Sequence, residues 1–184
     1  TAYDRRRDYA KAEAALRAAV LAVPHSASAA WRLANFLLVR DRAPEALPLL
    51  CIAASDDPSL RLPVFDLGLK LLTDPQRVFA EVVPALPDSR RSYFYFLVWN
   101  KQLYKQAIPI WKKVILDRSE ETLRIGTQYV EELATHGFGK QAADVWKDIV
   151  NQPAEGSSQP SADRMTNGDF EASLRNAGLD WRVE

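Results

Sequence analysis

The chain has 184 residues, of which 47% are hydrophobic and 26% charged, as expected for one folded globular domain with a sizeable core. Its 24 basic and 24 acidic residues cancel to a formal net charge of zero. This balance argues against a nucleic-acid binder, which carries a basic surplus that displaces counterions, and it gives no support for attachment to an acidic membrane surface.

The first predicted elements are helices that repeat with a period of 34 residues. Pro24 and Pro58 each end a largely apolar run, and they lie 34 residues apart. A proline cannot continue the hydrogen-bond ladder of a helix, so each of them marks a helix end. The same shift of 34 superposes three further pairs of identical residues: Ala12 on Ala46, Leu16 on Leu50 and Ala19 on Ala53. The sequence therefore predicts successive helix pairs of one design.

This pattern resembles the tetratricopeptide repeat (TPR) family. In that family, helix A carries Leu followed by a small residue, helix B carries spaced alanines, and a proline closes the repeat. Leu33-Ala34 and Leu67-Gly68 match the helix-A pattern. The resemblance covers residues 1–150, most closely up to residue 72. It implies an all-α fold of antiparallel helix pairs in a right-handed superhelical solenoid, followed by a mostly irregular C-terminal tail.

The later helices match the repeat less closely. They are predicted over four ranges: Arg90–Lys101, Tyr104–Leu116, Glu120–Thr135 and Lys140–Val150. Three prolines share one local pattern, in which an Ala or Val stands two positions before the proline: Pro48, Pro84 and Pro109. Each is expected to bend a B helix within its first two turns. Pro87 is expected to cut the third B helix short.

The composition changes after Asn151. Residues 151–164 are rich in Pro, Ser and Gly and are predicted to form a linker. In the tail, residues 165–184, the string 167–171 (Asn-Gly-Asp-Phe-Glu) and the later Trp181 resemble the first strand of a carbohydrate-binding module of the jelly-roll type. The alternative is a short capping helix over residues 169–177, with Asp169 as its N-cap.

The sequence contains no set of residues typical of catalysis. It has no Gly-rich phosphate loop, no metal-ligand spacing and no Gly-x-Ser-x-Gly elbow. Cys51 stands in an apolar run and is interpreted as a small buried hydrophobe, while His25 and His136 stand in no pairing motif. No stretch reaches the roughly 18 apolar residues that span a bilayer. We therefore expect a protein that is not an enzyme, uses no cofactor or metal and does not insert directly into a membrane.

The TPR resemblance also implies where a ligand would bind. In the family, the concave groove is lined by fixed helix-A positions, which here fall on eight residues: Trp31, Asn35, Leu38, Phe65, Leu69, Phe96, Trp99 and Asn100. This apolar set does not match the family's carboxylate clamp and favours an apolar peptide or helix of a protein partner. Two alternatives stay open: the aromatic residues are core between the layers, or the tail, residues 152–184, occupies the groove through Phe170 and Trp181.

Two functions follow from these patterns. The first is a protein–protein interaction scaffold, indicated by the repeats. The alternative is the helical part of a cell-envelope protein that handles polysaccharide through a carbohydrate-binding module, which rests on the string at 167–171 alone. The second interpretation favours a periplasmic or envelope location over the cytoplasm.

Overall fold

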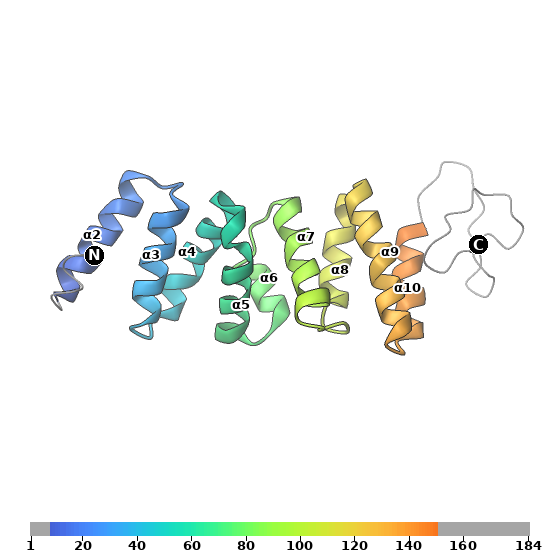
Figure 1. Ribbon diagram of the computed structural model, residues 1–184. Helices are drawn as coiled ribbons and strands as arrows, with labels where there is room; N and C mark the ends of the chain where they lie inside the picture. Colours follow the sequence, from blue (N-terminus) through green and yellow to red (C-terminus); the bar gives the residue numbers. More distant parts are fainter. Residues whose placement is uncertain (1–7, 151–184) are drawn as a thin grey trace, which may run out of the picture. The chain divides into compact units, whose positions relative to one another are not determined.

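The computed structural model describes residues 8–150, and over this range the chain is helical and contains no strand. It divides into two compact units, the first ending at Asn100 and the second beginning at Lys101. Figure 1 shows their helices coloured in chain order. The predicted all-α class is thus confirmed for the described residues. The predicted linker and the tail with its carbohydrate-module string lie outside them.

Polar caps set the starts of α2 (Tyr9–Ala22) and α3 (Ala27–Leu38). The carboxylate of Asp8 accepts a hydrogen bond of 3.3 Å from the backbone N–H of Lys11 at the start of α2. The hydroxyl of Ser26 accepts one of 3.3 Å from the N–H of Ala29 at the start of α3. Each cap satisfies an amide that has no acceptor inside its helix. Pro24 lies in the turn between the two helices, as predicted.

Helices α3 and α4 (Ala43–Asp56) pack against each other. Small and branched side chains alternate there, so that the two backbones approach closely. The residues buried on these two helices include Ala30, Leu33, Ala34 and Leu37 of α3 and Ala46, Leu50 and Ala53 of α4. In α2, Ala12 and Leu16 are buried as well, but Ala19 is exposed although its counterpart Ala53 is not.

A network of ion pairs joins α2 to α4. Arg17 contacts Glu13 on its own helix and Glu45 on α4, both at 2.8 Å. Arg42 reaches back to Glu13 at 2.8 Å and also pairs with Glu45. Hydrogen bonds from Arg42, and then from Arg17, lower the pKa of Glu45 to about 2 and also lower the pKa of Glu13. Both carboxylates are therefore held in the charged form.

This network predicts a dependence of stability on acid. The folded-state pKa of Glu45 is depressed from the ordinary 4.5 to about 2, so its contribution is complete above pH 4.5 and is lost as the pH falls toward 2. We expect Glu45→Gln to flatten the fall in melting temperature over this range, with a smaller effect in high salt because the groups are exposed. Circular dichroism melts against pH test this, with Glu120→Gln as the control. An unchanged acid profile for Glu45→Gln would contradict it.

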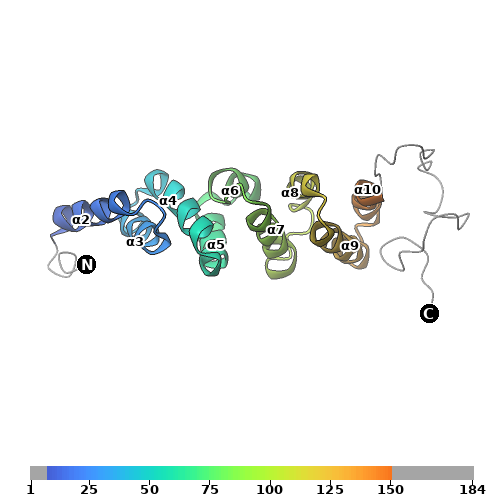
Figure 2. The same cartoon turned by 90° about the horizontal axis from the view of Figure 1, so that it is seen from above.

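A glycine lies where α5 (Arg61–Leu72) and α6 (Pro75–Glu81) of the first unit meet. A 3-10 turn, Pro58–Leu60, leads into α5, and α6 follows. A Cβ atom at Gly68 would lie 3.0 Å from Cγ1 of Val78, which explains the small residue after Leu67. Seen from above, α3, α5 and α7 form one layer of this unit, and α4 and α6 form the other (Figure 2).

Two proline predictions were wrong. Pro84 lies after the end of α6 at Glu81, so it bends no helix. Pro87 is the first residue of α7 (Pro87–Tyr95) and starts this helix instead of ending the one before, because a first-turn residue needs no N–H partner. The helix predicted over Arg90–Lys101 begins earlier, at Pro87, and its last turn is a π-helix, Phe96–Asn100. Pro48 does lie inside α4.

The second unit contains α8 (Ile108–Val114), a 3-10 turn (Ile115–Asp117), α9 (Glu120–Thr135) and α10 (Gly139–Val150). The bounds predicted for α9 are confirmed. The helix predicted over Lys140–Val150 begins one residue earlier, at Gly139. The helix predicted from Tyr104 begins only at Ile108, with Pro109 in its first turn, where it costs little. Tyr104 instead lies in a turn, where its carbonyl accepts a hydrogen bond of 2.5 Å from the hydroxyl of Tyr129.

Trp111 is one of the large buried side chains of the second unit. Trp111 is fully buried, and its ring lies over Gly126 of α9. A Cβ atom at Gly126 would lie 2.3 Å from Cη2 of Trp111, a distance that side chains do not tolerate. Only glycine at this point of α9 leaves room for the indole ring.

Within residues 8–150, no helix combines the length and the apolar character needed to cross a bilayer.

Candidate functional site

Three residues predicted for a groove lie along one flank of α3. Trp31, Asn35 and Leu38 follow one another at helical spacing, next to the stripe that packs on α4, and all three are half-buried. The side-chain amide of Asn35 donates a hydrogen bond of 2.8 Å to the carbonyl of Trp31, which fixes its orientation. This flank therefore presents an indole, an oriented amide and an aliphatic side chain with partial access.

Two of the predicted groove residues are core instead. The side chain of Phe65 on α5 is 0% exposed and that of Phe96 is 4% exposed. Phe65 contacts the ring of Tyr93 edge-on at 5.1 Å and that of Phe96 at 5.9 Å, both between ring centroids. Such aromatic contacts stabilise a core and leave little surface for a ligand. The sequence left open the alternative that the aromatic residues are core between the layers, and this alternative holds for Phe65 and Phe96.

The remaining groove residues lie at partly open positions. Leu69 on α5 and Trp99 in the π-helix are half-buried, and Asn100 is exposed. The ring of Trp99 stacks on that of Tyr95, with centroids 4.6 Å apart, and Tyr95 is 47% exposed. Tyr95 was not among the predicted residues. It becomes part of this surface because it stands four positions before Trp99, where helical geometry brings the two rings together.

We call the half-buried or exposed members of this set the helix-A surface of the first unit. They are Trp31, Asn35, Leu38, Leu69, Tyr95, Trp99 and Asn100. None of these seven side chains is charged, and two charged side chains of α5, Asp66 and Lys70, pair with each other at 2.6 Å. The surface is therefore suited to apolar and aromatic contacts more than to a charged group.

Burial raises the pKa of two groups in the first unit, Cys51 and Tyr93. Burial raises the pKa of the Cys51 thiol, so the protonated and poorly nucleophilic form dominates near neutral pH. Burial also raises the pKa of Tyr93, whose hydroxyl donates a hydrogen bond of 3.0 Å to the carbonyl of Pro75. No group of three or more His, Cys, Asp or Glu side chains that could hold a metal occurs among residues 8–150.

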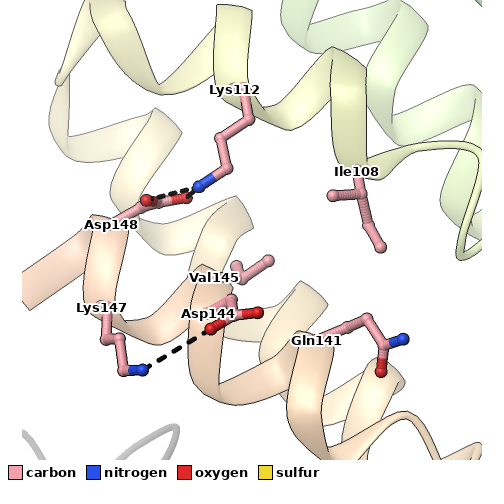
Figure 3. A pocket seen from close by; sticks show the side chains of 7 residues that line it. All are labelled: Ile108, Lys112, Gln141, Asp144, Val145, Lys147 and Asp148. Atoms are coloured by element: carbon pink, nitrogen blue, oxygen red, sulfur yellow. Dashed lines mark hydrogen bonds and ion pairs between the residues drawn. The ribbon is translucent and has the colours of Figure 1, made fainter. Parts of the chain in front are cut away.

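The second unit carries a hollow of about 360 Å³ between α8 and α10, which we call the α8–α10 hollow (Figure 3). Ile108 of α8 and Val145 of α10 form its apolar part. Its polar lining comes from Lys112 on α8 and from Gln141, Asp144, Lys147 and Asp148 on α10. The volume is within the range of about 300–1,000 Å³ found for small-ligand pockets.

Two ion pairs of different kinds border the α8–α10 hollow. Nζ of Lys112 lies 2.6 Å from Oδ2 of Asp148, and this carboxylate also accepts a hydrogen bond of 3.1 Å from Nε1 of Trp111. The second pair, Lys147 with Asp144, is looser at 3.6 Å, and both of its side chains are about half exposed, at 48% and 54%. The two pairs differ in their carboxylates: Asp148 is 23% exposed and has two donors, whereas Asp144 is 54% exposed; the two lysines are about equally open, with Lys112 at 52%.

Comparison with models of protein families, with curated proteins and with solved structures finds no match to this chain. Both surfaces are therefore interpreted from their own geometry.

Sequence reasoning did not find the α8–α10 hollow. Its lining residues come from two helices that are distant in the sequence: Lys112 of α8 and Asp148 of α10, for example, are 36 positions apart. One available signal was the helical spacing of Gln141, Asp144 and Asp148, which places the three polar side chains on one side of α10.

Proposed function

We propose that this protein is an interaction scaffold without catalytic activity, and that the helix-A surface of its first unit binds an apolar peptide or helix of a partner protein. The observation that carries the proposal is the exposure of large apolar side chains on folded, well-packed helices. Trp31, Leu38, Leu69 and Trp99 retain partial access, and Tyr95 is 47% exposed. Aromatic side chains of this kind dominate the energetics of protein interfaces.

The repeat pattern supports a particular arrangement of this surface. The shift of 34 residues brings α2 onto α4, and the buried alanines of α3 and α4 fit the close helix contacts that the TPR resemblance implies. On this proposal, the helix pairs stack as a right-handed solenoid and the helix-A side chains line its concave face. A pre-formed groove of this kind binds a peptide without the entropic cost of ordering a loop, and this saving favours affinity.

A random peptide library tests the proposal, because its use requires no assumption about which protein is the partner. The library would be selected on the immobilised full chain, and the binding of the enriched peptides would then be measured by fluorescence anisotropy. We expect Trp99→Ala to weaken their binding by at least about tenfold, the loss of a central aromatic contact, while the melting temperature changes little. Val39→Ala is the matched control, because Val39 is an exposed apolar residue of the first unit outside the helix-A surface.

Two results would count against this assignment. Peptides whose binding is equally insensitive to Trp99→Ala and to Trp31→Ala bind elsewhere on the chain. A Trp99→Ala variant that loses stability more than affinity would make Trp99 a core residue, as Phe65 is.

The polysaccharide alternative depends on residues outside the described range. Nothing in residues 8–150 favours it, so it stays a prediction from the string at 167–171.

A further inference from the structure

The two carboxylates that border the α8–α10 hollow differ in the contacts that they already make, and this difference indicates what the hollow could bind. The carboxylate of Asp148 already has two donors, Trp111 and Lys112. The Lys147–Asp144 pair is 3.6 Å long and about half exposed, so each partner can accept or donate a further contact. A fitting ligand would place an apolar group near Ile108 and Val145, with one negative and one positive charge beside it.

The chain itself carries such a ligand in the residues that follow α10 in the sequence. α10 ends at Val150, two residues after Asp148, and 34 further residues follow. Among them, Trp181 stands between Asp180 and Arg182 and so combines an apolar ring with one charge of each sign. Phe170, the other aromatic residue of this segment, stands between two acids, Asp169 and Glu171, and offers no cation for the carboxylate of Asp144.

The length of the intervening chain allows this contact. Trp181 follows Val150 by 31 positions, and a random coil of about 31 residues has a root-mean-square span of about 30 Å. This span exceeds the length of α10, which is about 18 Å for its 12 residues. A ligand tethered on such a span acts at an effective concentration of about 1 mM, so even weak contacts are populated.

We propose that the segment Asp180–Arg182 of this chain binds in the α8–α10 hollow. The indole ring of Trp181 contacts Ile108 and Val145, Asp180 pairs with Lys147, and Arg182 pairs with Asp144. The indole N–H has an acceptor available in the side chain of Gln141, which also lines the hollow. The contact differs from the helix-A surface in its residues, its unit and its occupant.

Hydrogen exchange on the full chain, read by mass spectrometry, tests the proposal. We expect Trp181→Ala to speed exchange of the amides in α8 and α10 by about tenfold, as follows from an effective concentration of about 1 mM and a dissociation constant of about 0.1 mM. Phe170→Ala is the matched control and should leave these amides unchanged. Equal exchange in the wild type and Trp181→Ala, or a larger effect of Phe170→Ala, would overturn the proposal.

Charge reversal tests the orientation of the segment. Lys147→Glu and Asp180→Lys should each speed exchange in α10, because each places like charges together, and the double variant should restore the wild-type rate. Lys147 is about half exposed, and the melting temperature of each variant serves as a check that the fold is intact. Exchange that stays fast in the double variant would overturn the pairing on which the proposal rests.

Dilution distinguishes the chain's own segment from that of a second copy. Protection supplied within one chain is independent of protein concentration, and light scattering then reports a monomer. Protection that disappears on dilution, together with a dimer at high concentration, would overturn the assignment to the same chain.

Discussion

Replacing Trp111 with alanine is expected to destabilise the second unit by about 4 kcal/mol, the upper range for a large-to-small change in a core. The side chain is fully buried, and its ring fills the space that Gly126 leaves open on α9. Its loss would leave a cavity that glycine cannot fill. It would also remove the N–H group that donates to the carboxylate of Asp148.

The measurement is a thermal melt combined with hydrogen exchange. For a chain of this size, about 4 kcal/mol corresponds to a fall in melting temperature on the order of 10 °C. Exchange should accelerate in α8, α9 and α10. Leu116→Ala is the control, since Leu116 is 79% exposed in the same unit and should change stability little. A loss below about 1 kcal/mol would show that Trp111 does not fill this core.

The second large effect is expected from Ala46→Trp, which should unfold the first unit. Ala46 is fully buried on α4, in the helix pair where small residues let α3 and α4 approach. An indole ring at this position must separate the two helices, and overpacking costs about 1–3 kcal/mol or more even for smaller insertions. We therefore expect a loss of helical signal near room temperature.

Ala80→Trp is the matched control for this experiment. Ala80 lies on α6 of the same unit but is exposed, so its replacement adds the same ring without a clash. If Ala46→Trp melted like the wild type, the helix register that places Ala46, Leu50 and Ala53 toward the core would be incorrect.

The sequence predicts a helix start best where a capping residue stands directly before it. Ser119 starts α9 because its hydroxyl accepts a hydrogen bond from the N–H of Thr122, and such a residue is visible in the sequence. The prolines were harder to interpret, because a proline can bend a helix, follow its end or occupy its first turn. Pro84 and Pro87 take the second and third roles, and only the packing of α6 and α7 decides this.

The candidate site could be predicted only in part, because a rotation of one position separates a groove residue from a core residue. On α3 the predicted positions lie beside the buried stripe, whereas on α5 the corresponding Phe65 is turned into an aromatic cluster with Tyr93 and Phe96. The partners in that cluster come from a helix about 30 positions later in the chain. A repeat pattern carries no information on such contacts once the repeats diverge.

The contact between Gly126 and Trp111 has a consequence for the history of this chain. Because the ring occupies the space of a missing Cβ atom, neither position can change freely while the other stays as it is. A methyl group at 126 becomes acceptable only after the residue at 111 has become smaller, for example leucine, and the opposite order passes through an unstable intermediate. In related sequences, the two positions should therefore covary, with glycine at 126 wherever tryptophan is found at 111.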